Sequence, residues 1–163
     1  MRRVVFFDRD GVVNDDTDHY YIYKPADFKL NEGIIDAFKF LISKGYDIII
    51  ITNQGGISKG VYSIQEVKLV HKHFLNLLKQ QEIVPLAIYF CPHHSDVEKC
   101  LCRKPNGLMI EKALARFSID KNQSFMIGDR EKDVKCAHNA GINGYKIETN
   151  ENCFPLVQKL VNE

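Results

Sequence analysis

The chain has 163 residues, enough for one domain spanning 1–163 with a single sizeable core and too few for a second domain of ordinary size. Its 22 lysine and arginine residues are balanced by 21 aspartate and glutamate residues, so charge gives no support for a nucleic-acid or membrane-surface partner. No apolar stretch approaches membrane-spanning length, and Met1-Arg2-Arg3 leads into a strand pattern rather than a signal-peptide core. We therefore expect a cytoplasmic, monomeric protein that acts on a small molecule.

Strand-like and helix-like apolar patterns alternate along the chain. Val4–Phe7 is β-branched and aromatic, and apolar residues with helical spacing follow at 34–42 before the stop signal Gly45. Further strands are expected at 47–52, 86–90, 124–127 and 145–147, and further helices at 67–78, 110–117, 133–140 and 156–161. Ser63 and Glu66 form a capping-box pattern ahead of the first of these helices. The alternation predicts an α/β, Rossmann-like parallel sheet with helices on both faces.

Polar side chains gather where the expected strands end. Asp8 and Asp10 follow the first strand, and residues two apart in an extended segment face the same way. Two crowded carboxylates repel unless a cation lies between them or one holds a proton, which suits a metal-assisted nucleophile beside an acid/base group. Taken alone, the segment is equally compatible with a strand-to-loop turn, where Asp and Gly are common for backbone reasons. Ligands bind at the carboxyl ends of parallel strands, where Thr52, Cys91 and Asp129 also fall.

Four short motifs occur in a fixed order at these strand ends. They are Asp8-x-Asp10-Gly11, Thr52-Asn53, Lys104, and Gly128-Asp129 with Asp133. Together they resemble the haloacid-dehalogenase (HAD) phosphatase superfamily, and the resemblance covers nearly the whole chain. It implies a HAD-like fold without a substantial cap domain, and Mg²⁺-dependent hydrolysis of a phosphate monoester through an aspartyl phosphate.

The resemblance also implies roles for individual residues. Asp8 is the nucleophile, and Asp10 protonates the leaving oxygen and then deprotonates water. Asp8, the backbone carbonyl of Asp10, and Asp129 hold Mg²⁺, a hard cation that prefers oxygen ligands. Thr52 and Lys104 bind the phosphoryl oxygens.

A second set of side chains has the composition of a metal site. Its members are Cys91, His93, Cys100 and Cys102. Four such ligands suit tetrahedral Zn²⁺ in a structural role, although free thiols are the alternative; the odd total of five cysteines argues against a disulfide framework. His94 is a weaker ligand candidate, and Cys136 and Cys153 are expected to be ordinary buried thiols. We expect the zinc loop at 91–105 to fix the basic pair at 103–104 beside the active site.

The motifs around the cysteines narrow the resemblance. Cys-Pro-His, Cys-x-Cys-Arg-Lys-Pro and the Asp-Arg-Asp-Gly of residues 8–11 resemble a group that contains heptose bisphosphate phosphatases and histidinol-phosphate phosphatases. The loop at 53–60 is similar to the heptose enzymes, whereas the short spacer between His93 and Cys100 is closer to the histidinol group. We give the loop more weight because a spacer can shorten without moving the ligands. The resemblance thus implies hydrolysis of the 7-phosphate of D-glycero-D-manno-heptose 1,7-bisphosphate, a phosphorylated sugar, with histidinol phosphate as the alternative substrate.

Three further residues are expected to bind this substrate: Asn53, Arg103 and Arg130. Arg130 stands where many heptose enzymes have lysine, which keeps the charge but changes the geometry. Asp133 is expected to orient Lys104 through a salt bridge and to stay outside the metal set.

Two other classes of protein share some of these features. A phospho-receiver domain also carries a phosphorylatable Asp at a strand end, but Asp10 and the zinc loop argue against it. A zinc-dependent nucleic-acid module is disfavoured by the balanced charge. His71, His73 and His138 are expected to be solvated and without a role, and the segment 18–21 either contacts substrate or packs over the core.

Overall fold

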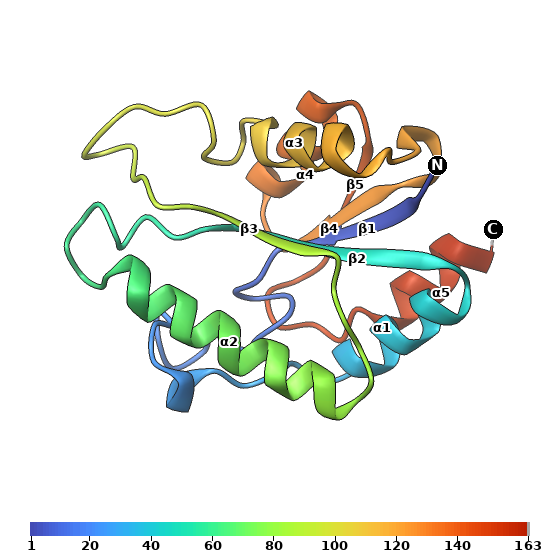
Figure 1. Cartoon of the computed structure of the whole chain (residues 1–163), viewed down its shortest axis with the longest axis horizontal. Helices are drawn as coiled ribbons and strands as arrows, with labels where there is room; N and C mark the ends of the chain where they lie inside the picture. Colours follow the sequence, from blue (N-terminus) through green and yellow to red (C-terminus); the bar gives the residue numbers. More distant parts are fainter. Residues whose placement is uncertain (163) are drawn as a thin grey trace.

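The computed structural model describes residues 1–162, which build one five-stranded parallel sheet (Figure 1). In chain order the strands are β1 (Arg3–Phe7), β2 (Tyr46–Asn53), β3 (Ala87–Cys91), β4 (Phe125–Gly128) and β5 (Asn143–Lys146). In space the order is β3-β2-β1-β4-β5, and Val5 pairs with Ile48 on one side and with Phe125 on the other. A central strand is buried on both faces, which explains why the first apolar run has no polar interruption.

Helices cover both faces of the sheet. α1 (Ile34–Ser43), α2 (Ile64–Gln80) and α5 (Phe154–Asn162) lie on one face, and α3 (Leu108–Phe117) and α4 (Glu131–Ala140) lie on the other (Figure 1). Short 3-10 turns occupy Pro25–Asp27 and Lys121–Gln123. Within residues 1–162, no helix combines the length and the apolar character that crossing a bilayer requires.

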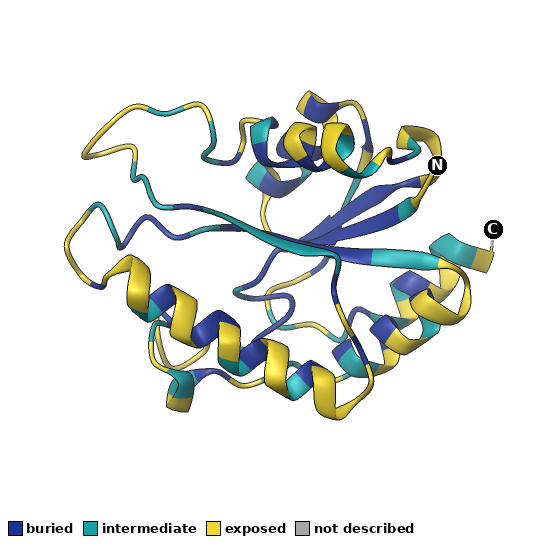
Figure 2. Ribbon diagram, in the orientation of Figure 1, coloured by how far each residue is buried: buried dark blue, intermediate teal, exposed yellow. Residues whose placement is uncertain are grey.

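The two faces of β1 supply two hydrophobic cores. Successive residues of a strand point to opposite faces, so Val5 and Phe7 join the core under α1, α2 and α5, whereas Val4 and Phe6 join the core under α3 and α4. Burial of each phenylalanine contributes on the order of 2–3 kcal/mol. Figure 2 shows β1 among the buried elements, with buried and exposed residues alternating along α2. The predicted α/β fold with both faces covered is confirmed.

The bounds of the elements differ from the sequence expectation by a few residues. The capping box of α2 is confirmed: the Ser63 hydroxyl accepts from the Glu66 amide at 3.2 Å, and the Glu66 carboxylate accepts from the Ser63 amide at 2.7 Å. β5, by contrast, begins two residues before the predicted start. Its pairing with β4 starts at Asn143, and Gly144 lies so close to α4 that a Cβ would stand 3.0 Å from the Val134 Cα. The apolar pattern marks only the residues that face the core.

Candidate active site

The carboxyl ends of the strands share one edge of the sheet. Asp8 directly follows β1, Thr52 lies at the end of β2, Cys91 closes β3, and Asp129 follows β4. This confirms the predicted convergence at the strand ends. A hollow of about 110 Å³ opens there, and both Asp8 and Asp10 line it.

Lys104 joins two carboxylates at the base of this hollow. Its Nζ lies 2.7 Å from Asp8 Oδ1 and 2.7 Å from Asp133 Oδ1, and it donates to the backbone carbonyl of Ile51 at 3.0 Å. Lys104 is only 2% exposed and Asp133 is wholly buried. The salt bridge expected between Asp133 and Lys104 is therefore present in the structure.

Burial and neighbouring charges shift the pKa values of Asp8 and Lys104. Burial, the Asp133 carboxylate and the Asp129 carboxylate raise the pKa of Asp8 to about 8, although Lys104 acts in the opposite direction. Burial opposes the charge of Lys104, but Asp133 and Asp8 outweigh it and raise the lysine pKa. The lysine is thus held as a cation, whereas Asp8 needs a further positive charge to become a carboxylate at neutral pH.

Asp129 leaves room for such a charge. Its Oδ2 accepts from the Thr149 hydroxyl at 2.8 Å, but its buried Oδ1 has no hydrogen-bond partner among residues 1–162. Carboxylate oxygens of Asp8, Asp129 and Asp133 lie within 4.8 Å of one another. An unpaired buried oxygen beside a second carboxylate is the environment that a divalent cation satisfies.

Asp10 is held from two sides. Its Oδ1 accepts from Arg9 Nη2 at 2.9 Å and from Asn14 Nδ2 at 3.0 Å, and its Oδ2 accepts from Gln54 Nε2 at 3.0 Å. Burial alone would raise the pKa of Asp10, but the Arg9 guanidinium and these amide donors lower it. The structure therefore holds Asp10 as a carboxylate with a fixed orientation.

Gln54 links Asp10 to the end of β2. Its amide nitrogen also donates to Thr52 Oγ1 at 3.0 Å, and its carbonyl accepts from the Tyr62 hydroxyl at 2.6 Å. Thr52, Gln54 and Tyr62 are all buried. One amide thus fixes the Thr52 hydroxyl and the Asp10 carboxylate relative to each other.

Asn53 is bound to the backbone of the lysine loop. Its Oδ1 accepts from the Lys104 amide at 2.9 Å, and its Nδ2 donates to the Lys104 carbonyl at 3.2 Å. Asn53 lines the hollow, but its amide group is engaged by these two bonds. It fixes the loop that carries the lysine.

The sequence expectation for His71 was wrong. The residue is only 8% exposed, and Nε2 lies 3.3 Å from Arg9 Nη1. Helical spacing suggested solvent at this position, but the ring packs edge-on against Phe90 of β3 and contacts Arg9 of the loop after β1. His73 is half-buried against Phe28, whereas His138 is exposed as expected.

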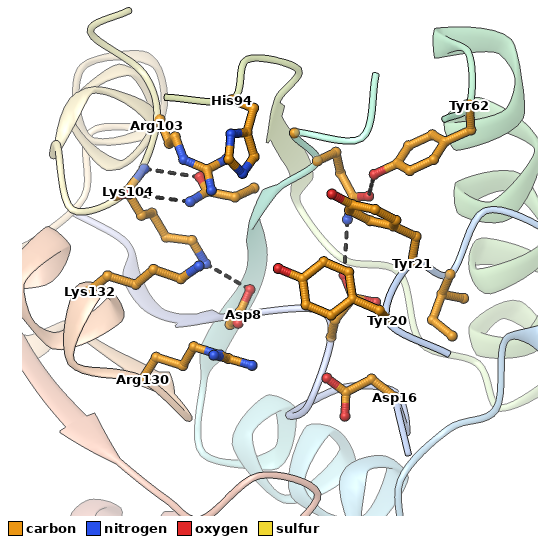
Figure 3. A pocket seen from close by; sticks show the side chains of 15 residues that line it. Asp8, Asp16, Tyr20, Tyr21, Tyr62, His94, Arg103, Lys104, Arg130 and Lys132 are labelled. Carbon is orange, nitrogen blue, oxygen red and sulfur yellow. Dashed lines mark hydrogen bonds and ion pairs between the residues drawn. The ribbon is translucent and has the colours of Figure 1, made fainter. Parts of the chain in front are cut away.

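The upper walls of the hollow are basic on one side and aromatic on the other. Figure 3 shows Arg103, Arg130 and Lys132 facing Tyr20 and Tyr21 across the opening. Arg103 donates to the His93 carbonyl at 2.9 Å, whereas the Arg130 side chain is 57% exposed. The segment 18–21 thus places two aromatic rings at the opening of the hollow.

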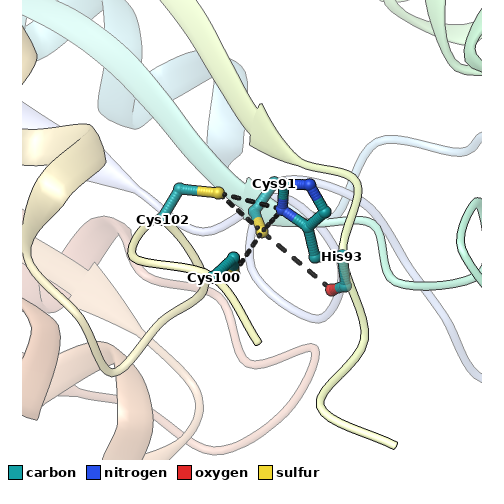
Figure 4. Close-up of side chains that lie close together, drawn as sticks. All are labelled: Cys91, His93, Cys100 and Cys102. Carbon is teal, nitrogen blue, oxygen red and sulfur yellow. Dashed lines mark hydrogen bonds between the residues drawn. The ribbon is translucent and has the colours of Figure 1, made fainter. Parts of the chain in front are cut away.

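The four predicted zinc ligands come together beside this basic wall (Figure 4). Cys91 Sγ lies 3.1 Å from Cys102 Sγ and 3.7 Å from Cys100 Sγ, and His93 Nδ1 lies 3.3 Å from Cys102 Sγ. Burial opposes ionisation of Cys100, but hydrogen bonds from backbone amides and neighbouring thiols lower its pKa to about 7. Three sulfurs and an imidazole nitrogen at these separations suit one tetrahedral cation. Cys136 and Cys153 are buried outside the cluster, as expected.

Several residues of the site carried no sequence assignment. They are Arg9, Gln54, Tyr62 and Lys132. Arg9 had one available signal, since a charged residue between two aspartates at the end of a buried strand has little access to water. Tyr62 reaches the site from the loop before α2 and Lys132 from the first turn of α4, and spacing in the sequence does not reveal either approach.

Comparisons with known proteins agree with this geometry. A sequence profile of the HAD-hydrolase-like family matches residues 101–155. D-glycero-alpha-D-manno-heptose-1,7-bisphosphate 7-phosphatase of Photorhabdus laumondii is 39% identical over 146 residues, which are 86% of this chain and 79% of the relative. D-glycero-beta-D-manno-heptose-1,7-bisphosphate 7-phosphatase of Haemophilus influenzae is 37% identical over 155 residues, 92% of this chain and 80% of the relative.

A solved structure has the same architecture. D,D-heptose 1,7-bisphosphate phosphatase of B. bronchiseptica, complexed with magnesium and phosphate, superimposes with a TM-score of 0.84 at 29% identity. The match covers 96% of this chain and 86% of that chain. The resemblance read from the motifs therefore extends to the whole fold.

Proposed function

Because this chain belongs to the D-glycero-D-manno-heptose-1,7-bisphosphate 7-phosphatase family of HAD phosphatases, we propose that it hydrolyses the 7-phosphate of a heptose 1,7-bisphosphate. The observation that carries the proposal is the 39% identity to the Photorhabdus laumondii enzyme. Relatives named for the alpha and for the beta anomer both match, so the proposal concerns the 7-phosphate and not the configuration at carbon 1.

The chemistry follows from the positions of the two aspartates. A carboxylate oxygen of Asp8 forms a bond to phosphorus while the bond from phosphorus to the sugar oxygen breaks, and the leaving oxygen takes a proton from Asp10. Asp10 then removes a proton from water, whose oxygen attacks the aspartyl phosphate and releases inorganic phosphate. Asp10 first takes up this proton from solvent, and the negative charge of the incoming phosphate favours that uptake.

Lys104 and Thr52 hold the phosphoryl oxygens in this proposal. The lysine is already a cation 2.7 Å from Asp8, and the Thr52 hydroxyl is oriented by Gln54. Preorganised donors at the reacting phosphoryl group stabilise the transition state without reorganising as the charge moves. Asn53 contributes indirectly, through the Lys104 backbone that it binds.

We propose that Asp8, Asp129 and the backbone carbonyl of Asp10 hold Mg²⁺. The unpaired buried Oδ1 of Asp129 and the raised pKa of Asp8 support this donor set. Bound there, the cation supplies positive charge that offsets the repulsion between the carboxylates and the phosphate. Asp133 stays outside the set because both of its oxygens are engaged: Oδ1 contacts Lys104 at 2.7 Å, and Oδ2 accepts from the Arg130 amide at 3.1 Å.

We further propose that Cys91, His93, Cys100 and Cys102 hold a structural Zn²⁺ that fixes the loop before Lys104. The reduced thiols that such a site needs suit the cytoplasm. Protein purified without chelator should contain about one equivalent of zinc. Cys102→Ser should lose the metal and raise KM while the unfolding temperature changes little. Cys153 is a buried thiol outside the cluster, so Cys153→Ser should keep the metal.

A phosphate-release assay tests the substrate. The panel contains both anomers of heptose 1,7-bisphosphate, several sugar monophosphates and histidinol phosphate, with Mg²⁺ and with excess chelator. We expect kcat/KM to be highest for a heptose bisphosphate and activity to disappear in chelator. A higher kcat/KM for histidinol phosphate would assign the chain to the alternative substrate.

A further inference from the structure

Arg9 is a cation with no exposure to water. Its Nε and Nη2 donate to Asp10 Oδ1 at 3.2 and 2.9 Å, and Nη2 also donates to the Ile22 carbonyl at 2.8 Å. Nη1 lies 3.3 Å from His71 Nε2. Burying a guanidinium costs several kcal/mol unless its donors and its charge are satisfied, so each of these partners matters.

His71 supplies the acceptor for Nη1. Within residues 1–162 it is the one hydrogen-bond partner of that nitrogen. The ring is buried on α2 and packs edge-on against Phe90 at 5.8 Å between ring centroids. Burial and the Arg9 charge lower the pKa of His71 to about 3, so the imidazole is neutral and its proton is on Nδ1 when Nε2 accepts.

We propose that His71 and Arg9 are positioning residues that aim the Asp10 carboxyl group at the leaving oxygen. The inference rests on the proposed function, in which Asp10 transfers the proton. A carboxylate that accepts from both Nε and Nη2 of one guanidinium cannot rotate without breaking those bonds, and the guanidinium is itself fixed by α2 and by the loop that carries Ile22. Asn14 also donates to Oδ1 and Gln54 donates to Oδ2, so Arg9 supplies two of the four hydrogen bonds that fix the carboxyl group.

The chemistry of the leaving group separates this role from a merely structural one. When the bond from phosphorus to a sugar oxygen breaks, the oxygen would depart as a basic alkoxide unless Asp10 gives it a proton. A 4-nitrophenolate leaves readily without that proton. A misaimed Asp10 therefore slows the reaction of the sugar ester more than that of the aryl ester, whereas general loosening of the site slows both equally.

The test compares these esters in variants of His71. His71→Phe keeps the aromatic contact with Phe90 but offers no acceptor, and His71→Gln offers an amide oxygen. His73→Leu, on the same helix and half-buried, is the matched control. The quantity is kcat/KM for heptose 1,7-bisphosphate and for 4-nitrophenyl phosphate, because kcat/KM reports the step in which the leaving group departs even where hydrolysis of the aspartyl phosphate limits kcat.

We expect His71→Phe to lose at least about tenfold more kcat/KM on the sugar ester than on the aryl ester. His71→Gln should restore most of the difference, and His73→Leu should leave the ratio unchanged. Equal losses on the two esters, or no loss, in folded His71→Phe would overturn the inference; if that variant does not fold, His71→Leu takes its place under the same criterion. Failure of the proposed function gives a different result: the wild-type protein would then prefer another alkyl phosphate to heptose 1,7-bisphosphate. The ratio of kcat/KM values would in that case be measured with that alkyl phosphate and 4-nitrophenyl phosphate.

Discussion

The side chains at the base of the active site are buried and paired, whereas those at its opening are exposed to water. At the base, Lys104 is 2% exposed and lies 2.7 Å from each of two buried carboxylates. At the opening, the Arg130 side chain is 57% exposed and Tyr20 is 81% exposed. Each charge at the base is stabilised by a buried neighbour, whereas the side chains at the opening are also stabilised by water.

This difference predicts which substitutions affect chemistry and which affect substrate choice. Removing one partner of a buried ion pair leaves an uncompensated charge and costs about 3–5 kcal/mol. Removing an exposed charge typically costs less than about 1 kcal/mol of stability. Changes at the base should therefore lower kcat for every substrate, and changes at the opening should alter the preference between substrates.

The largest expected effect is that of Asp8→Asn. The substitution removes the nucleophile and a proposed metal ligand together, so kcat should fall by at least about 10⁴-fold. The fold should remain, because the amide is isosteric and removes a carboxyl group whose ionised form is disfavoured. Phosphate release and circular dichroism measure the two effects, with Asp36→Asn on the exposed face of α1 as the control. Wild-type turnover in folded Asp8→Asn would refute the mechanism.

Asp133→Asn should have the next largest effect. The change removes a buried negative charge from Lys104 Nζ, and the lysine then pairs more tightly with Asp8, the proposed nucleophile. We expect kcat to fall about 10²-fold with a smaller change in KM. Glu131→Gln, in the same helical turn but exposed, is the matched control. If kcat is unchanged, the salt bridge serves folding alone, and a lower unfolding temperature should then be the main result.

Magnesium should stabilise the protein more as pH rises. The folded-state pKa of Asp8 is raised to about 8, above its unfolded value, so in metal-free protein its contribution to stability is complete below about pH 4 and is lost as pH rises through 8. The cation replaces that proton. Thermal unfolding should show a gain of about 2 kcal/mol from saturating Mg²⁺ near pH 8 and a smaller gain near pH 5.

Asp8→Asn is the control for this pH dependence. Its amide does not titrate, so the increase in the magnesium effect between pH 5 and pH 8 should largely vanish. A magnesium effect that is the same at both pH values in the wild type would count against Asp8 as a ligand.

Much of the base was predictable from the sequence, and much of its support was not. Asp8 and Asp129 follow short apolar runs that end at the same sheet edge, so strand patterns and the motif resemblance place both of them. His71 was missed because its burial depends on Phe90 of β3 and on Arg9 of the loop after β1, and both residues are distant from it in the sequence. Helical periodicity identifies the apolar side of a helix, and it contains no information on a polar position that a strand end and a loop cover.

Arg103→Ala is expected to have the smallest of these effects, and it tests the opening. Nη1 of Arg103 donates to the His93 carbonyl at 2.9 Å, which orients the guanidinium along the wall of the hollow. Arginine can bind a second phosphate group bidentately, and binding energy far from the reacting phosphoryl group can raise the rate at the 7-phosphate. The variant should lose about tenfold, or about 1.4 kcal/mol, of the preference for heptose bisphosphate over 4-nitrophenyl phosphate. Arg103→Lys should be intermediate, because lysine keeps the charge but lacks the paired donors of a guanidinium. Arg116→Ala on α3 should leave the preference unchanged. An equal loss on both substrates would mean that Arg103 acts at the reacting phosphoryl group. Arg103 would then belong to the base of the site and not to its opening.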